Sequence, residues 1–341
     1  MSSTDVRFPR PLRPGDTIGV TAPSSGVQTS LLPRLDVACE HLRRRGYEVR
    51  RGAVLEAPDG GVAAPAAQRA AELTAMLCDP DVRAVVPPWG GELAIQVLDH
   101  LDWDALAAAE PTWLVGWSDL TTLMVPLLTR LGWATLHGGN LMDTPYRQPE
   151  GLAHWLDVLE TEPGDPVVQA SPGRHRSGGF DDWEVEPGLA EQQLDLTGSW
   201  EVVGGGGLDL TGRIVGGCIE VLGPLVGTPY ADVAGWGRAQ VDEGLVVYVE
   251  AAEHAAFDVC RALHGMRMAG WFDEAEAVLV GRTSGPDSPG LSQRQAVLDA
   301  LGPLVLGVDV GHVPPNLPLV NGASCRVVVD ARRSEITQVW G

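Results

Sequence analysis

The stretch Trp113-Leu114-Val115-Gly116-Trp117-Ser118-Asp119-Leu120 determines how the first half of this chain is interpreted. Its apolar start predicts a short strand, and the glycine predicts a tight turn. Over residues 120–131 apolar side chains recur every three or four positions, which predicts a helix. A strand that passes through a turn into a helix raises the central side chain, Ser118, above the sheet. On this motif alone, a nucleophile and a simple helix N-cap are equally good interpretations of Ser118.

Strand-like and helix-like segments also alternate before this turn. The alternation is typical of an α/β domain with a mostly parallel sheet and helices on both faces. In such domains ligand sites gather beyond the carboxyl ends of the strands. The predicted strands are 16–22, 47–51 and 82–86, and the predicted helices are 31–45, 66–77 and a segment through Ile95, Leu98 and Leu101.

The composition changes between residues 160 and 207, where Pro, Gly, Asp and Ser dominate and periodic apolar residues are few. We therefore predict an α/β protein of two domains. The parallel-sheet N-terminal domain, residues 1–160, carries the turn at Ser118. A connecting segment, 161–207, leads to a smaller mixed α/β domain, 208–341. In that domain we predict strands at 245–249, 277–280 and 305–308, and a hairpin of 326–330 with 335–339.

Charge and composition exclude several functions. The formal net charge of −21 argues against sequence-independent binding to nucleic acid or to an anionic membrane. All 24 basic residues are arginine, so a Schiff-base lysine, a Walker A lysine and a Ser-Lys dyad are excluded. The five cysteines form no C-x-x-C pair, and we expect neither a disulfide framework nor a metal or cofactor site. Without an apolar leader or a long apolar run, the chain is expected to be cytoplasmic.

Other chemically useful residues also follow predicted strands. Glu250 ends the run 245–249, and Glu253 nearby could compete with it. His312 follows the run 305–308 and has the best context for a general base, with His137 second. The segment Trp89-Gly90-Gly91 could let backbone approach a ligand and supply an oxyanion N–H, or be a plain turn. Each signal alone is weak, but together they give a nucleophile, an acid and a base.

The sequence also resembles the LD-carboxypeptidase family of serine peptidases, which includes the microcin C immunity proteins. The resemblance implies that Ser118 is the nucleophile, Glu250 the acid and His312 the base. It further implies an active site between two domains and a homodimer. It rests on residues 12–20, Trp89-Gly90-Gly91, Gly116-Trp117-Ser118-Asp119, residues 212–217, Val249-Glu250 and Gly311-His312.

Within that family, several segments look more like the microcin-immunity branch than the murein tetrapeptide branch: 250–253, 261–263, 270–272 and the insertion with Trp183 and Trp200. That branch cleaves aminoacyl-nucleotide conjugates and stacks aromatic side chains on the base. Either tryptophan could serve, or could be a packing anchor. The family's Gly-Gly-Asn-Leu is Gly216-Gly217-Cys218-Ile219 here, and without lysine His254 or Arg261 would have to contact the substrate.

The expected chemistry is acyl transfer to Ser118, with His312 moving the proton and Glu250 orienting the imidazole. The N–H groups of Gly91 and Asp119 are expected to form the oxyanion hole. The substrate is expected to be an aminoacyl- or peptidyl-nucleotide, or alternatively a murein tetrapeptide. An α/β-hydrolase esterase, a non-enzymatic two-lobe binding protein and a metal-dependent hydrolase are the rivals. The expected substrate-binding residues are Trp89, Gly90, Trp183, Trp200 and His254.

Overall fold

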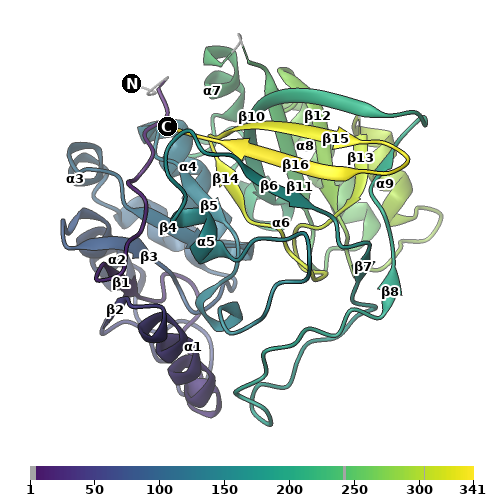
Figure 1. The fold of residues 1–341 in the computed structure, drawn as a ribbon. Coiled ribbons are helices and arrows are strands. Elements are labelled where there is room, and N and C mark those ends of the chain that lie inside the picture. The colour runs from purple at the N-terminus through teal and green to yellow at the C-terminus, as the bar shows by residue number, and fades with distance from the viewer. Residues whose placement is uncertain (1–4, 241–242, 303) are drawn as a thin grey trace.

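The computed structural model describes residues 5–240, 243–302 and 304–341. Two sheets lie side by side, each with helices packed against it (Figure 1). The first half of the chain builds most of one sheet and the second half most of the other, which confirms the two-domain α/β prediction. No helix among the described residues is both long enough and apolar enough to cross a membrane.

The N-terminal sheet has six strands in the order β14-β5-β4-β3-β1-β2. Strands β1 to β5 are parallel to one another. Its central strands are buried on both faces, as expected for a parallel sheet covered by helices. The strands are β1 (Thr17–Val20), β2 (Glu48–Arg51), β3 (Val82–Val85), β4 (Trp113–Gly116), β5 (Thr135–His137) and β14 (Leu319–Asn321).

The helices of this lobe follow the apolar periodicity closely. The predicted helices 31–45 and 66–77 are confirmed, whereas the segment through Ile95 is a 3₁₀ helix. The helix after the turn ends at Gly132, whose φ of +69° is a left-handed C-cap that suits glycine. The helices are α1 (Leu32–Arg44), α2 (Ala66–Cys78), η2 (Ala94–His100), α3 (Trp103–Ala108), α4 (Thr121–Leu131) and α5 (Trp155–Leu159).

The C-terminal sheet has eight strands in the order β6-β16-β15-β10-β11-β12-β13-β9, of which β10 to β13 are parallel. The predicted hairpin is confirmed as β15 and β16. The strands are β6 (Val167–Ala170), β9 (Glu201–Val202), β10 (Leu208–Cys218), β11 (Leu245–Glu250), β12 (Ala275–Gly281), β13 (Leu304–Val308), β15 (Ser324–Val329) and β16 (Ser334–Val339). The helices are α6 (Ile219–Leu222), α7 (Val233–Ala239), α8 (Ala256–Met268) and α9 (Gln293–Ala300).

The two lobes interlock. Strand β14, from the C-terminal third of the sequence, pairs antiparallel with β5 of the N-terminal sheet. The segment 161–207, expected to be a connection, contributes β6 and β9 to the edges of the C-terminal sheet. It also forms a small ribbon of β7 (Arg174–His175) and β8 (Leu196–Thr197), which projects from the body in Figure 1. The carboxyl ends of the parallel strands in both sheets can therefore supply residues to one site.

Candidate active site

Ser118 lies directly after β4, at the start of the short 3₁₀ helix Ser118–Leu120 that leads into α4. Its φ is +63°, and it is the only described residue other than glycine with a positive φ. This left-handed conformation costs a residue other than glycine roughly 1 kcal/mol or more, and such strain is concentrated at functional sites. The backbone therefore holds the Ser118 hydroxyl above the sheet edge, as the strand–turn–helix pattern predicts.

Two groups after β5 hold this turn in place. The backbone N–H of Trp117 donates to Oδ1 of Asn140 at 3.1 Å, and the Trp117 indole N–H donates to Oδ2 of Asp143 at 2.9 Å. Gly116 has a φ of +149°, and a Cβ there would lie 2.7 Å from Oδ1 of Asn140. Only glycine therefore lets the turn approach the Asn140 amide so closely.

Asp119 is almost fully buried and ties together three segments around the turn. Its carboxylate accepts hydrogen bonds from the Ser24 hydroxyl, the Ala94 N–H and the Thr122 hydroxyl. Burial raises the pKa of this carboxyl, although these hydrogen bonds oppose the shift. The Asp119 side chain therefore has a structural role, and only its backbone N–H is left for an oxyanion.

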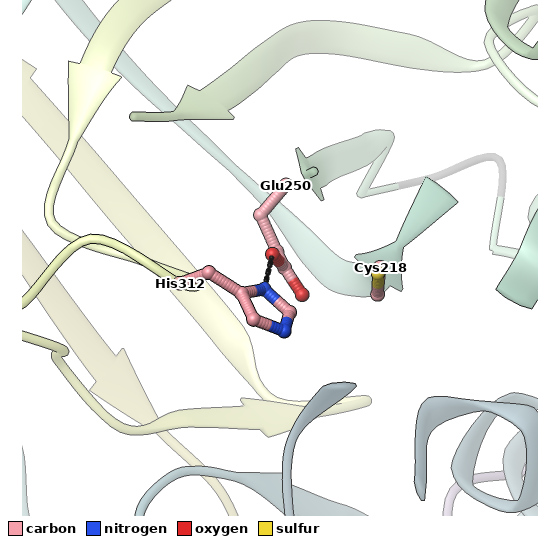
Figure 2. Close-up of side chains that lie close together, drawn as sticks. All are labelled: Cys218, Glu250 and His312. Carbon is pink, nitrogen blue, oxygen red and sulfur yellow. Dashed lines mark hydrogen bonds and ion pairs between the residues drawn. The ribbon is translucent and has the colours of Figure 1, made fainter. Parts of the chain in front are cut away.

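Glu250 and His312 reach Ser118 from the other lobe. Glu250 ends β11, and His312 lies in the loop after β13. His312 Nε2 is 3.0 Å from Ser118 Oγ. On the other side of the ring, His312 Nδ1 is 2.7 Å from Glu250 Oε2, the contact that Figure 2 marks with a dashed line. These distances place a hydroxyl, an imidazole and a carboxylate in the order that a catalytic triad requires.

Gly311 allows the carboxylate to approach the imidazole. Its φ is +101°, and a Cβ at this position would lie 2.6 Å from Oε2 of Glu250. Both the conformation and the space therefore require glycine at the residue before His312.

The imidazole and the carboxylate stabilise each other's charge. Burial alone would lower the pKa of His312, but the charge and hydrogen bond of Glu250, with smaller contributions from Glu220 and Glu253, raise it. Burial would raise the pKa of Glu250, but His312 outweighs it and the pKa of this carboxyl is lowered. The site therefore favours a carboxylate beside an imidazole that gains a proton readily.

The second oxygen of Glu250, Oε1, is buried and has no hydrogen-bond partner among the described residues. Figure 2 shows it on the side of Cys218, and the donor atoms of Cys218, Glu250 and His312 all lie within 4.8 Å of one another. These three could bind a metal ion as a group, as could Cys260, His264 and Asp299 near the surface. In the first group, however, Glu250 and His312 already serve the hydrogen-bond chain to Ser118.

The expected oxyanion groups lie beside Ser118. A Cβ on Gly90 would be 2.9 Å from Cβ of Ser118 and 3.0 Å from N of Asp119, so only glycine fits between the loop after β3 and the turn. Gly91 has a φ of +137°, and no described acceptor takes its N–H. The N–H groups of Gly91 and Asp119 thus remain the candidates for an oxyanion hole.

Two cavities share His312 as a lining residue. The first, the aromatic arm, has a volume of about 680 Å³ and contains Trp89, Trp117 and Trp183 in its lining. The second, the acidic arm, has a volume of about 550 Å³, and Ser118 and Gly91 are among the residues that line it. Further lining residues of the aromatic arm are Tyr146, Trp155, Arg176 and Phe180, and those of the acidic arm include Glu92, Glu220, Glu253, His254 and Asp258.

Of the expected substrate-binding residues, Trp89, Trp183 and His254 line one of these arms, and Gly90 packs beside Ser118. Trp200 is the exception, because its ring is 4% exposed and its indole N–H donates to the buried Asp309 carboxylate. It lines neither arm, so its interpretation as a stacking residue is wrong, and it is a core residue.

Three supporting residues were not predicted from the sequence: Trp117, Asn140 and Asp143. A signal was present, since Gly138-Gly139-Asn140 follows an apolar run in the way that the other site segments do. His137, the second candidate base, is buried against Tyr248, and burial lowers its pKa to about 4. It has no described hydrogen bond to Ser118, whereas His312 Nε2 lies within hydrogen-bonding distance of Ser118 Oγ.

The fold and the site together define a serine-type hydrolase: a hydroxyl on a strained turn, a histidine and a carboxylate at the carboxyl edge of parallel strands. The chain matches the LD-carboxypeptidase N-terminal domain over residues 18–138 and the C-terminal domain over residues 211–327. It therefore belongs to the LD-carboxypeptidase family of serine-type carboxypeptidases.

Two relatives resemble the chain over nearly its whole length. A carboxypeptidase homologue of Streptomyces coelicolor is 30% identical, over 94% of this chain and 93% of its own. The microcin C7 self-immunity protein MccF of Escherichia coli is 22% identical over 97% and 95%.

Solved structures agree in fold. MccF in complex with glutamyl sulfamoyl guanosine matches with a TM-score of 0.80 at 20% identity over 98% of both chains, and its complex with aspartyl sulfamoyl adenosine with 0.79 at 21% and the same coverage. Muramoyltetrapeptide carboxypeptidase from Oxalobacter formigenes gives 0.68 at 21% identity, over 95% of this chain and 98% of its own.

Proposed function

We propose that this carboxypeptidase hydrolyses an amide-type acyl–nitrogen bond of an aminoacyl- or peptidyl-nucleotide through Ser118, His312 and Glu250. The observation that carries the proposal is the continuous hydrogen-bond chain from Ser118 Oγ through the imidazole to Oε2 of Glu250, at 3.0 and 2.7 Å. Family membership supports the reaction class, and the geometry supports these three residues as the groups that perform it.

In the proposed mechanism, Ser118 Oγ attacks the carbonyl carbon while His312 Nε2 takes the hydroxyl proton. The Glu250 carboxylate stabilises the resulting imidazolium through Nδ1. Backbone N–H groups of Gly91 and Asp119 bind the oxyanion. The acyl–nitrogen bond then breaks as His312 protonates the departing nitrogen, and water hydrolyses the acyl-enzyme by the same steps in reverse.

The aromatic arm favours a nucleotide as the leaving half of the substrate. Four tryptophans and a tyrosine line a cavity that reaches His312, and purine bases gain about 1–3 kcal/mol by stacking on such rings. Trp183 is fixed by a hydrogen bond from its indole N–H to the Tyr146 hydroxyl at 2.7 Å, and Arg34 lies over its ring. A fixed ring loses little conformational entropy on binding.

Two alternatives have different support. A murein tetrapeptide would use the same triad, and relatives named as murein peptide carboxypeptidases keep it as the second candidate substrate. A non-enzymatic two-lobe binding protein would not need a hydroxyl, an imidazole and a carboxylate in hydrogen-bonding sequence. The geometry and the family therefore count against the non-enzymatic alternative.

The family resemblance also leads us to propose a cytoplasmic homodimer. The five cysteines are all free, which suits a reducing compartment. Sedimentation equilibrium would test the oligomeric state, since a monomer at micromolar concentration would contradict the dimer.

The substrate proposal is tested by a turnover comparison. Purified protein is given an aminoacyl sulfamoyl adenosine and a murein tetrapeptide under identical conditions, and release of product is followed by chromatography. We expect the nucleotide conjugate to have the higher kcat/KM. A higher kcat/KM for the tetrapeptide would overturn the proposed substrate and leave the proposed triad intact.

A further inference from the structure

The acidic arm carries an excess of negative charge. Besides the buried Asp119, whose carboxylate is held by the hydrogen bonds described above, four carboxylates line it: Glu92, Glu220, Glu253 and Asp258. Among the described residues that line it there is no arginine, and the sequence contains no lysine. The arm is not an isolated acidic patch, because Ser118 and His312 form part of the same cavity wall. A group bound there therefore touches the reacting centre.

Two of these carboxylates already have partners. Glu220 accepts hydrogen bonds from the N–H groups of Glu253 and His254, both at 2.7 Å, and so fixes the loop after β11. Asp258 forms an ion pair with Arg261 at 2.5 Å on the exposed side of α8. Glu92 and Glu253 have no ion pair with a described arginine and are free to meet a ligand.

The carboxylates act on one another and on the imidazole. Partial desolvation of its carboxyl, followed by the charges of Asp119, Glu220 and Glu253, raises the pKa of Glu92, although the residue as a whole is exposed. The charges of Glu220 and Glu253 also help to raise the pKa of His312. Such mutual repulsion is relieved when a cation enters, so a positively charged group is the natural occupant of the arm.

The position of the arm assigns it to one half of the substrate. His312 lines both cavities, so the bond to be cleaved lies where they meet. With the nucleoside in the aromatic arm, the acyl half extends into the acidic arm. An acidic aminoacyl group, as in the aspartyl and glutamyl conjugates seen with MccF, would be repelled by Glu92 and Glu253.

We propose that Glu92 and Glu253 select substrates whose acyl residue carries a cationic side chain, such as lysyl or arginyl conjugates, over aspartyl and glutamyl ones. The inference rests on the proposed function and specifies the acyl half of its substrate. Both carboxylates are exposed and screened by solvent, so the expected preference is moderate, about tenfold or more in kcat/KM.

The test compares lysyl, alanyl and aspartyl sulfamoyl adenosine. Turnover is measured with the wild-type protein, and the dissociation constant is measured by calorimetry with Ser118→Ala. We expect the lysyl conjugate to have a kcat/KM about tenfold or more above that of the aspartyl conjugate, and a dissociation constant lower by a similar factor. The ratio should fall toward one in the double variant Glu92→Gln/Glu253→Gln. The control Glu110→Gln alters an exposed carboxylate before β4, at the opposite end of the strand from Ser118, and should leave the ratio unchanged.

The outcomes separate the two proposals. An aspartyl conjugate that binds or reacts as well as the lysyl one would overturn the acidic-arm inference. A lysyl preference in binding without any turnover by the wild-type protein would support the arm and overturn the proposed reaction. A preference that survives in the double variant would also contradict the role of Glu92 and Glu253.

Discussion

His312 Nε2 lies 3.0 Å from Ser118 Oγ, although 194 positions separate the two residues in the sequence. One comes from the turn after β4 in the N-terminal sheet and the other from the loop after β13 in the C-terminal sheet. The site therefore exists only when the two lobes are packed together. Substitutions in the turn, beside the imidazole and in the cavities should therefore have different effects on stability, activity and binding.

The left-handed backbone at Ser118 predicts a difference between two variants. Ser118→Ala and Ser118→Gly both remove the hydroxyl and its contact with His312, but only glycine adopts a φ of +63° without strain. Ser118→Gly should therefore have a free energy of unfolding about 1 kcal/mol higher than Ser118→Ala, as measured by urea denaturation. Equal stabilities would show that the turn relaxes to another conformation.

Gly311 predicts a linked loss of stability and activity. Gly311→Ala would place a Cβ 2.6 Å from Oε2 of Glu250, so the carboxylate must move away from the imidazole. We expect a loss of about 2–4 kcal/mol in the free energy of unfolding and at least a hundredfold lower kcat.

Gly290→Ala is the matched control. Gly290 also has a positive φ, +77°, but no atom lies within 4 Å of its added Cβ. Its cost should be only about 1 kcal/mol, with activity unchanged. Activity retained in Gly311→Ala would contradict the role of the close approach.

The raised pKa of His312 predicts the pH dependence of the reaction. In the proposed mechanism the neutral imidazole of His312 is the base, so kcat/KM should fall on the acid side with an apparent pKa above the ordinary value of 6.5. Glu253→Gln removes one of the charges that raise the pKa of His312, so the acid limb should move to lower pH. A pH–rate profile of both proteins would measure this shift. An acid limb that moves to higher pH in Glu253→Gln would contradict the prediction.

The two tryptophans of the insertion should behave differently. Trp183 lines the aromatic arm, so Trp183→Ala should weaken binding of adenosine monophosphate by about 1–3 kcal/mol in calorimetry. Trp200 is packed in the core, so Trp200→Ala should lower the free energy of unfolding by about 3–5 kcal/mol. Unchanged nucleotide binding in folded Trp183→Ala would exclude stacking on that ring.

The sequence predicts the features of the site that depend on local pattern. The strand, turn and helix around Ser118 are contiguous, and Glu250 and His312 each follow a strongly apolar strand. Because the carboxyl ends of parallel strands within one sheet meet at one edge, Glu250 and His312 could be grouped without knowing any distance. Ser118 follows a strand of the other sheet, so local pattern alone does not bring it to them.

The remaining features depend on pairing between distant segments. Strand β14 has three residues, and its place beside β5 in the other lobe follows from no local periodicity. Trp200 has the same sequence context whether it lies in a loop or is packed in a core, and its burial and its hydrogen bond to Asp309 show that it belongs to the core. The acidic arm likewise brings together Glu92 and Glu253, which are far apart in the sequence.

The most direct test of the central claim is the turnover of an aminoacyl sulfamoyl adenosine by wild-type protein and by Ser118→Ala, compared after thermal melting has shown that both are folded. Removal of a triad nucleophile typically lowers kcat by a factor on the order of 10⁴–10⁶, and we predict a loss of that size. Wild-type turnover by the folded Ser118→Ala protein would contradict the account.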